Sequence, residues 1–246
     1  MRQPAASYDQ YEHDHATFEQ GLSPNEPAWL RDLRARGLEA FSTLGFPTAT
    51  RGNERWKYTN VGPIARETFS LRTDGSQNGL TRAAFAENGL LQDGQTALVF
   101  VNGRYSQALS TPTESSNRLR ISTVAEAAQS DGALVKAHLG RYASGDDDGF
   151  TALNTAFLHD GAYIHVADGN SEKVVVRLSY ITTDPTTADS GPMVTYPRTL
   201  IVVGRDSDVT VVESYTGPAD SVYFTNAVTE ISVGAGAHVD HYRLLL

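Results

Sequence analysis

Histidine and carboxylate side chains stand close together at three places in this sequence, and such neighbours can bind a metal ion or exchange protons. The three sets are His13, Asp14 and His15, then His159 and Asp160, then His238, Asp240 and His241. Each set offers at most three ligands, so a metal site at any of them needs further ligands from elsewhere in the fold.

The first two sets have simpler structural interpretations. Residues 1–22 are polar and poor in aliphatic side chains, which predicts a disordered tail with solvated histidines. His159 and Asp160 precede Gly161, and the side chains of adjacent residues rarely face each other. We therefore expect a turn beside the first strand of a repeat rather than an acid–base pair.

In the third set, His238 and Asp240 alternate along a predicted strand and share one face, whereas His241 points to the other face. We interpret these side chains as strand or interface residues. The prediction is therefore that this chain has no catalytic, cofactor-binding or metal-binding residue and holds no cofactor of its own.

Two further clusters also favour a structural role. Asp146–Asp148 could hold a hard cation but lacks the spacing of a calcium loop, so we predict an exposed linker. Basic side chains mixed with aromatic ones, as in Arg51 and Arg55–Tyr58, bind nucleic acid or phosphate in other proteins. In a chain with a net charge of −9, we expect these aromatic rings to pack on the first helix instead.

Composition and missing motifs exclude several classes of function. There is no Walker, dinucleotide-binding or nucleophile-elbow pattern, and no cysteine for a disulfide, a thiol nucleophile or a thiolate ligand. The acidic balance without a Lys/Arg cluster argues against a nucleic-acid partner. No apolar run reaches the roughly 18 residues of a membrane span, and no signal pattern opens the chain, which predicts a cytoplasmic protein.

The elements that position these residues are set by a repeat in the last third of the chain. Two strand–turn–strand units superpose Gly204 on Gly234, 30 residues apart, and Ile201 on Ile231. A weaker copy runs from Ala162 through Gly169 to Leu178. Repeats of this length built from strands predict a stacked parallel β-solenoid.

The strand pattern also predicts which faces are covered. Leu200–Val203 are all apolar, so both faces of that strand require cover. In the next repeat Thr229, Ile231 and Val233 are expected to point inward, with Glu230 and Ser232 outward. This register also places Arg243 directly on Glu213, and Val239 on Val209.

Preceding elements are predicted from local signals. Ser23–Glu26 has the form of a helix start, and apolar side chains at helical spacing continue to Leu44, before Gly45. The segment 97–101 predicts a strand with a hairpin turn at Asn102–Gly103. A strand at 118–122 follows, and a helix begins at Ser122 or Thr123.

The predicted fold class is α+β. Residues 1–22 are predicted to be a disordered tail, and residues 23–150 an N-terminal helical region with a small β element. Residues 151–246 are predicted to be the start of a right-handed parallel β-helix. The last strand ends in Leu244–Leu246 with an open edge, which predicts a chain truncated inside its repeat domain. Pairing of this strand with another chain remains an alternative.

Several motifs, in this order along the chain, resemble the SufB/SufD family of iron–sulfur cluster assembly proteins, and SufD most of all. They are Trp29, GFPT (45–48), Glu54 with WKYTN (56–60), LVFVNGRYSQALS (98–110), LNTAFLHDGAYIHV (153–166), PRTLIVVG (197–204) and NAVTEISV (226–233). The resemblance covers nearly everything after residue 23. No single motif is decisive, since none is catalytic.

The resemblance implies a β-helix and a non-catalytic subunit of a SufBCD-type complex. It implies pairing with a SufB-like subunit, action with a SufC-like ATPase, and a cluster at the assembled complex. No functional residue is transferred, because the family's interface strands lie beyond this sequence. The alternatives are a β-solenoid carbohydrate-active enzyme and a homo-oligomeric structural module, for instance a homodimer paired through its open end.

Overall fold

The computed structural model describes residues 6–49, 54–71, 80–81, 96–111, 116–170, 172, 174–183 and 191–246. Its helices are α1 (Ala6–Gln20), α2 (Ala28–Leu44), α3 (Gly62–Arg66), α5 (Val124–Ser130), α6 (Gly132–His138) and α7 (Gly149–Ala156). Its strands are β1 (Ser70–Leu71), β2 (Thr96–Val101), β3 (Arg104–Tyr105), β4 (Leu119–Thr123), β5 (Gly161–Val166), β6 (Val174–Ile181), β7 (Met193–Thr195), β8 (Arg198–Val203), β9 (Asp208–Thr216), β10 (Tyr223–Thr225), β11 (Val228–Val233) and β12 (His238–Leu245).

The strands form a mixed α/β structure with three sheets, ordered β1-β7-β10, β11-β8-β5-β4 and β12-β9-β6-β2-β3. Strands β5, β8 and β11 are parallel, and so are β6, β9 and β12. Only β3 and β4, at one end of their sheets, are antiparallel to their neighbours. Successive passes of the chain therefore stack in register from β5 onward, while the predicted closed right-handed β-helix stays a prediction.

The pairing confirms the register predicted from the repeats. Ile201 pairs with Ile231, Val209 with Val239, and Glu213 with Arg243. The weaker upstream copy also pairs as predicted, since Ala162–Val166 lie beside Thr199–Val203 and Val174 beside Val209. Gly234 stacks on Gly204 so closely that an added Cβ would lie 2.7 Å from the carbonyl carbon of Gly204.

The sharp turns between strands contain one residue in the left-handed region at each level. These are Gly169, Asp206 and Gly236, with φ values of 68°, 52° and 72°. The amide of Gly169 donates to the Arg205 carbonyl, and the amide of Asp206 donates to the Ala235 carbonyl. Gly169 therefore lies level with Asp206 and Gly236. It is not level with Gly204, because Gly169 is the third residue after β5 whereas Gly204 is the first residue after β8.

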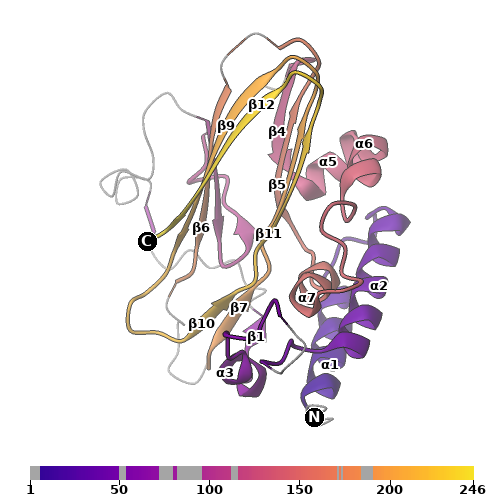
Figure 1. Ribbon diagram of the computed structural model, residues 1–246, viewed down its shortest axis with the longest axis vertical. Coiled ribbons are helices and arrows are strands. Elements are labelled where there is room, and N and C mark those ends of the chain that lie inside the picture. The colour runs from indigo at the N-terminus through magenta and orange to yellow at the C-terminus, as the bar shows by residue number, and fades with distance from the viewer. Residues whose placement is uncertain are drawn as a thin grey trace.

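Two apolar layers hold the strands in place. Inside the stack, alternate residues of β5, β6, β8 and β9 form one core, which includes Ile164, Leu178 and Ile201. On the outer face, Tyr163 and Leu200 pack against α5, α6 and α2. Helices α5 and α6 cover the outer face of the sheet that contains β5 and β8, and α1, α2 and α7 lie on the same side (Figure 1). Leu200–Val203 are buried on both faces, as predicted.

Residues 6–20, predicted to be part of a disordered tail, form helix α1 instead. His15 and Phe18 are buried, and the Phe18 ring packs beside Phe157 at 5.5 Å. The guanidinium of Arg34 is fully buried and donates to Glu19 on α1, to Glu26, and to the Leu158 carbonyl. Composition alone missed this helix because its stability comes from a cation that lies on α2.

The second helix begins later than predicted, at Ala28 with Pro27 in the cap position. The Glu26 carboxylate binds Arg34, so it does not close a capping box on Ser23, whose hydroxyl accepts from the Asn25 amide. The helix ends before Gly45, which has a φ of 64°.

The other local predictions are confirmed. They concern the strand at 96–101, the turn at Asn102–Gly103, the strand at 119–123 and the capped start of α5.

The domain boundary at 150/151 stays a prediction. Helix α7 crosses it and packs extensively on α2, so the helical layer and the first strand of the stack are joined at this point. No helix in the described part of the chain is both long and apolar enough to cross a membrane.

Candidate functional site

A fully buried ion pair joins the outer faces of β8 and β11. The Arg198 guanidinium donates to Glu230 Oε1 from Nη2 at 2.5 Å and from Nε at 3.1 Å, and neither side chain is exposed. Sequence alternation correctly placed Glu230 on the outward face of its strand, but that face is covered by helices and loops. The outward position of Glu230 is therefore confirmed, but Glu230 is 1% exposed, and the alternation did not predict what covers it.

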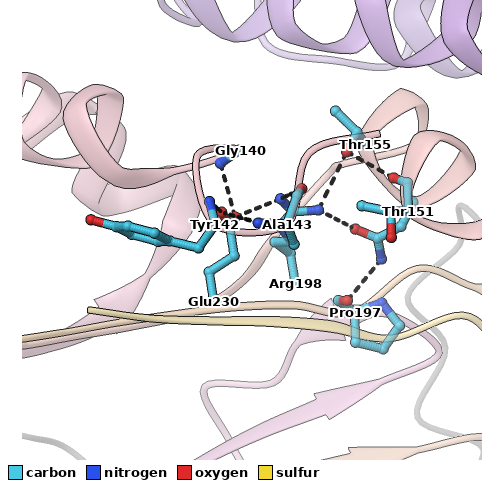
Figure 2. A network of polar contacts seen from close by, with 9 residues as sticks. Gly140, Tyr142, Ala143, Thr151, Thr155, Pro197, Arg198 and Glu230 are labelled. Atoms are coloured by element: carbon cyan, nitrogen blue, oxygen red, sulfur yellow. Dashed lines mark hydrogen bonds and ion pairs between the residues drawn. The ribbon is translucent and has the colours of Figure 1, made fainter. Parts of the chain in front are cut away.

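The remaining donors and acceptors of the pair are also satisfied. Glu230 accepts from the backbone amides of Gly140, Tyr142 and Ala143 at 2.8, 2.9 and 3.2 Å. Arg198 donates to Asn154 Oδ1 at 2.9 Å and to the Thr155 hydroxyl (Figure 2). Because no lone pair or N–H is left for a substrate, this Arg198–Glu230 network can position elements but has no open site for chemistry.

Asn154 extends the network from helix α7 to the strands. Its amide donates to the carbonyls of Pro197 and Asn226, at 2.9 and 2.7 Å. Burial lowers the pKa of Arg198, and the adjacent Glu230 carboxylate opposes that shift. The loop after α6, helix α7 and two levels of the stack are therefore tied together by one buried charge pair.

A second carboxylate, Glu213, lies on β9 of another sheet and points into the stack. It accepts from the Thr229 hydroxyl at 3.0 Å, from the Tyr215 hydroxyl at 3.1 Å and from Arg243 at 3.2 Å. His241 Nε2 lies 3.5 Å from Glu213 Oε1. Burial raises the pKa of Glu213, but His241, Arg243 and Thr229 together outweigh burial, so the net pKa lies below its usual value.

The Glu213 cluster lies beside open space rather than under helices. A cavity of about 520 Å³ is lined by Tyr215, Tyr223, Thr225, Ala227, Arg243 and Leu245. The Glu213 side chain is fully buried, but 43% of Arg243 and 22% of His241 are exposed. Phe100, Tyr180 and Tyr215 stack in a column beneath it, with ring centroids 5.0 and 5.1 Å apart. A ligand or protein segment in this cavity could therefore reach donors on Arg243.

The side chains of His159 and Asp160, adjacent in the sequence, contact different partners in the structure. His159 contacts the Arg104 guanidinium, whereas Asp160 accepts from the amides of Gly161 and Ala125, so the two side chains do not bond to each other, as predicted. Burial, Arg104 and Arg34 lower the pKa of His159 to about 3. Burial raises the pKa of Asp160 to about 6, against the opposing effect of its amide donors.

The other predicted positions also have structural partners. His238 and Asp240 share an exposed face 3.4 Å apart, and His241 points to the opposite face, as the alternation predicts. His13 is exposed on α1 and His15 is buried. No group of three or more His, Cys, Asp or Glu side chains within metal-binding reach occurs among the residues that the structure describes.

The acidic and basic clusters are tied to the fold. Asp148 caps α7 by accepting from the Thr151 amide at 2.8 Å and pairs with Arg55, so the acidic run is more than an exposed linker. The Trp56 ring packs on Phe150 of α7 at 5.2 Å, whereas Tyr58 is 90% exposed. The prediction that the aromatic rings of this cluster pack on the first helix was therefore wrong for Tyr58. Arg51 lies outside the described residues.

Comparison with known proteins adds an independent observation. The family model named SufBD protein N-terminal region matches residues 5–178. The family model named SUF system FeS cluster assembly, SufBD core domain, matches residues 185–245. The chain belongs to the SufBD family. The resemblance found in the sequence motifs is thereby confirmed.

Individual relatives are distant but match along most of the chain. A SufBD family protein of Synechocystis is 28% identical over 232 residues, 90% of this chain and 49% of that protein. The SufD proteins of Bacillus subtilis and Escherichia coli are each 27% identical, over 88% and 84% of this chain and 48% and 44% of their own lengths. The chain thus spans about half the length of these relatives.

Sequence reasoning missed the three residues at the centre of the outer network, Arg198, Glu230 and Asn154. A usable signal was present for two of them. With the repeats aligned, Leu200 is level with Glu230 and Val228 with Arg198, so the two charges fall two positions apart on the same face of neighbouring strands. Opposite charges so placed within apolar strands predict a buried pair. Asn154 gave no comparable signal.

Proposed function

We propose that this SufBD family chain is part of a SufD-type, non-catalytic subunit of an iron–sulfur cluster assembly complex. In that complex its strands are the first turns of a right-handed parallel β-helix, which pairs with a SufB-type subunit and acts with a SufC-type ATPase. The proposal places the complex in the cytoplasm. The observation that carries it is the order of the two family matches, N-terminal region and then core, along one chain.

Two structural features support this proposal. The parallel, in-register stacking of β5, β8 and β11 and of β6, β9 and β12 is the arrangement that a β-helix requires. The only fully buried charge pair described above, Arg198–Glu230, is saturated by structural partners, which suits a positioning element better than a reaction centre.

The composition favours a SufD-type role over that of the subunit which anchors a cluster. These 246 residues contain no cysteine. Thiolate is the usual ligand of iron–sulfur clusters, so thiolates for a cluster in the complex must come from elsewhere. The cluster is therefore cargo of the assembly, and no residue described here is assigned to hold it.

Affinity capture tests the proposal. The natural protein, tagged at its N-terminus in its own host, is expected to retain SufB-type and SufC-type proteins in fixed ratio through size-exclusion chromatography. Reconstitution of the captured complex with iron and sulfide is expected to give the visible absorbance of a cluster, and omission of this subunit should reduce it. Purification as a lone monomer, or cleavage of pectin-like polymers, would refute the proposal. The variant Asp168→Asn, which changes one exposed surface charge, serves as a control for the handling of the protein and should leave capture unchanged.

A further inference from the structure

A groove on the helical layer carries positive charge on a protein that is otherwise acidic. A cavity of about 380 Å³ lies between α2 and the end of α6, and its lining includes Trp29, Leu33, Arg36, Lys136 and Arg141. A neighbouring cavity of about 160 Å³ shares Leu33 and Arg36 with it. Against the net charge of −9 for the whole chain, this groove has three cations and a single carboxylate, Asp32.

The three cations are available to a ligand. Arg36, Lys136 and Arg141 are exposed, and none makes a side-chain hydrogen bond or ion pair with any residue of the described ranges. Other basic side chains in this part of the molecule do have partners, for example Arg34 with Glu19 and Glu26, and Arg120 with Asp131. Three unpaired cations around one groove leave an uncompensated local field that attracts anionic groups.

The groove is held in shape before any ligand arrives. Gly140 and Tyr142, on either side of Arg141, both donate their amides to the buried Glu230 carboxylate. Gly140 adopts a φ of +76°, and an added Cβ would lie 3.1 Å from Leu33 at the floor of the groove. Arg141 therefore extends from a fixed loop, and fixing a binding surface in advance lowers the entropy lost on association.

The chemistry of the groove favours carboxylates on an extended segment over a compact phosphate. Phosphate sites typically use convergent backbone amides. Here the amides of Gly140, Tyr142 and Ala143 are already bound to Glu230, and the end of α6 presents carbonyls. The cations come from two helices and a loop, and Trp29 and Leu33 add an apolar wall, which matches spaced carboxylates around an apolar side chain.

We propose that the groove between α2 and α6, lined by Trp29, Arg36, Lys136 and Arg141, docks an acidic segment of a partner protein. The segment has Asp or Glu side chains on both sides of an apolar residue that packs on Trp29 and Leu33. This site is separate from the Glu213 cluster and from pairing with a SufB-type subunit, so its failure would leave that proposal standing.

Peptide binding tests the groove directly. The probe is a capped decapeptide with four Glu residues around a central Leu, and its control has Gln at those four positions. Binding is measured by calorimetry and by Trp29 fluorescence in a Trp56→Phe background, since the chain has two tryptophans. The acidic peptide is expected to bind more weakly as salt is raised, and the Gln peptide is expected to bind at least about tenfold more weakly.

Charge-reversal variants locate the site. The triple variant Arg36→Glu, Lys136→Glu, Arg141→Glu is expected to lose about tenfold or more in affinity, whereas Arg118→Glu, an exposed cation away from the groove, should bind within about twofold of the unaltered protein. If the triple variant does not fold, Arg36→Gln with Arg141→Gln replaces it. Equal binding by the groove variants, equal binding of the Gln peptide, or binding of phosphate or ATP without the peptide would overturn the proposal.

Discussion

Two buried glutamates, on strands of different sheets, lie in contrasting surroundings. Glu230 faces outward from β11 and is covered by the helical layer, and each of its bonds is to a fixed backbone amide or to the buried Arg198. Glu213 faces inward from β9, and its cation, Arg243, is 43% exposed beside a cavity. The partners of the first carboxylate are closed to ligands, whereas Arg243, a partner of the second, is within their reach.

The difference shows that burial of a charge does not by itself identify a functional site. Glu230 and Glu213 are equally buried as side chains, at 0% exposure each. They differ in whether their partners are buried and saturated or partly open to solvent. In this molecule the rigid pair joins the helical layer to the strand stack, while the open cluster lies where the stack presents side chains to whatever packs beside it.

The largest expected effect comes from breaking the closed pair. Glu230→Gln leaves Arg198 as a buried cation without a counter-charge, and removal of one partner of such a pair costs about 3–5 kcal/mol. Urea unfolding at neutral pH should show this loss in the free energy of unfolding.

A double replacement separates charge from shape at the same place. Arg198→Met with Glu230→Gln removes both charges but keeps an oxygen that accepts from the loop amides. It should regain part of the stability that Glu230→Gln alone loses, because no unpaired charge remains. Ser232→Ala, two residues further along the same face of β11, serves as the matched control and should change stability little. Comparable losses in the double variant and in Glu230→Gln would show that the loop contacts, not the charges, hold the network.

Asp160 extends the comparison to a buried carboxylate that bonds to backbone amides and to the Thr123 side chain, with no cation bonded to it. Burial raises its pKa from 3.8 to about 6 in the folded protein, so folding takes up a proton between these values. This group therefore makes stability fall as pH rises from about 4 to about 6, by on the order of 3 kcal/mol, and adds no further slope above pH 6.

The measurement is the pH dependence of unfolding in the protein and in Asp160→Asn. The variant should lack the decline between pH 4 and pH 6, because the amide does not titrate. An unchanged slope in the variant would mean that Asp160 ionises as freely in the folded chain as in the unfolded one.

Replacement of Glu213 should have a smaller effect on stability. The pH dependence of its contribution should have the opposite sign to that of Asp160. Glu213→Gln keeps the acceptor for Thr229 and Tyr215 but loses the charge that faces Arg243 and His241, and solvent screens part of that loss. We expect a decrease of about 1–2 kcal/mol in the free energy of unfolding at pH 7. Because the folded pKa of Glu213 is below its ordinary value of 4.5, this contribution is present above that pH and is lost as the pH falls below it.

The test is to compare Glu213→Gln with the unaltered protein at pH 7 and at pH 3. The stability difference should shrink at the lower pH, since the contribution of the ionised carboxylate is lost as the pH falls toward the lowered pKa of Glu213 in the folded protein. A difference that stays constant from pH 7 to pH 3 would assign the loss to packing, and the cluster would then resemble the closed network more than an open site.

The sequence could predict the strand stack because its signals are local and repeated. Ile201 and Ile231, with Gly204 and Gly234, gave the register, and alternation gave the face of Glu230. What covers that face could not be predicted, since the loop at 140–143 approaches it from about 90 residues upstream. Helix α1 was missed for a related reason, because Phe157 and Arg34, which lie outside that segment, provide partners that its own composition does not suggest.

The smallest expected effect belongs to the ion pair of Asp168 and Arg205. This pair also joins neighbouring levels of the stack, but it is exposed to solvent. Asp168 and Arg205 join neighbouring turns at 2.8 Å, but their side chains are 56% and 70% exposed. Hydrogen bonds from Arg205 lower the pKa of Asp168. Water solvates both charges almost as well when they are apart, so Asp168→Asn should leave the midpoint of urea unfolding unchanged within error, and raised salt should not alter that result. A loss approaching that of Glu230→Gln would show that position in the stack, rather than burial of the charges, determines what each pair contributes.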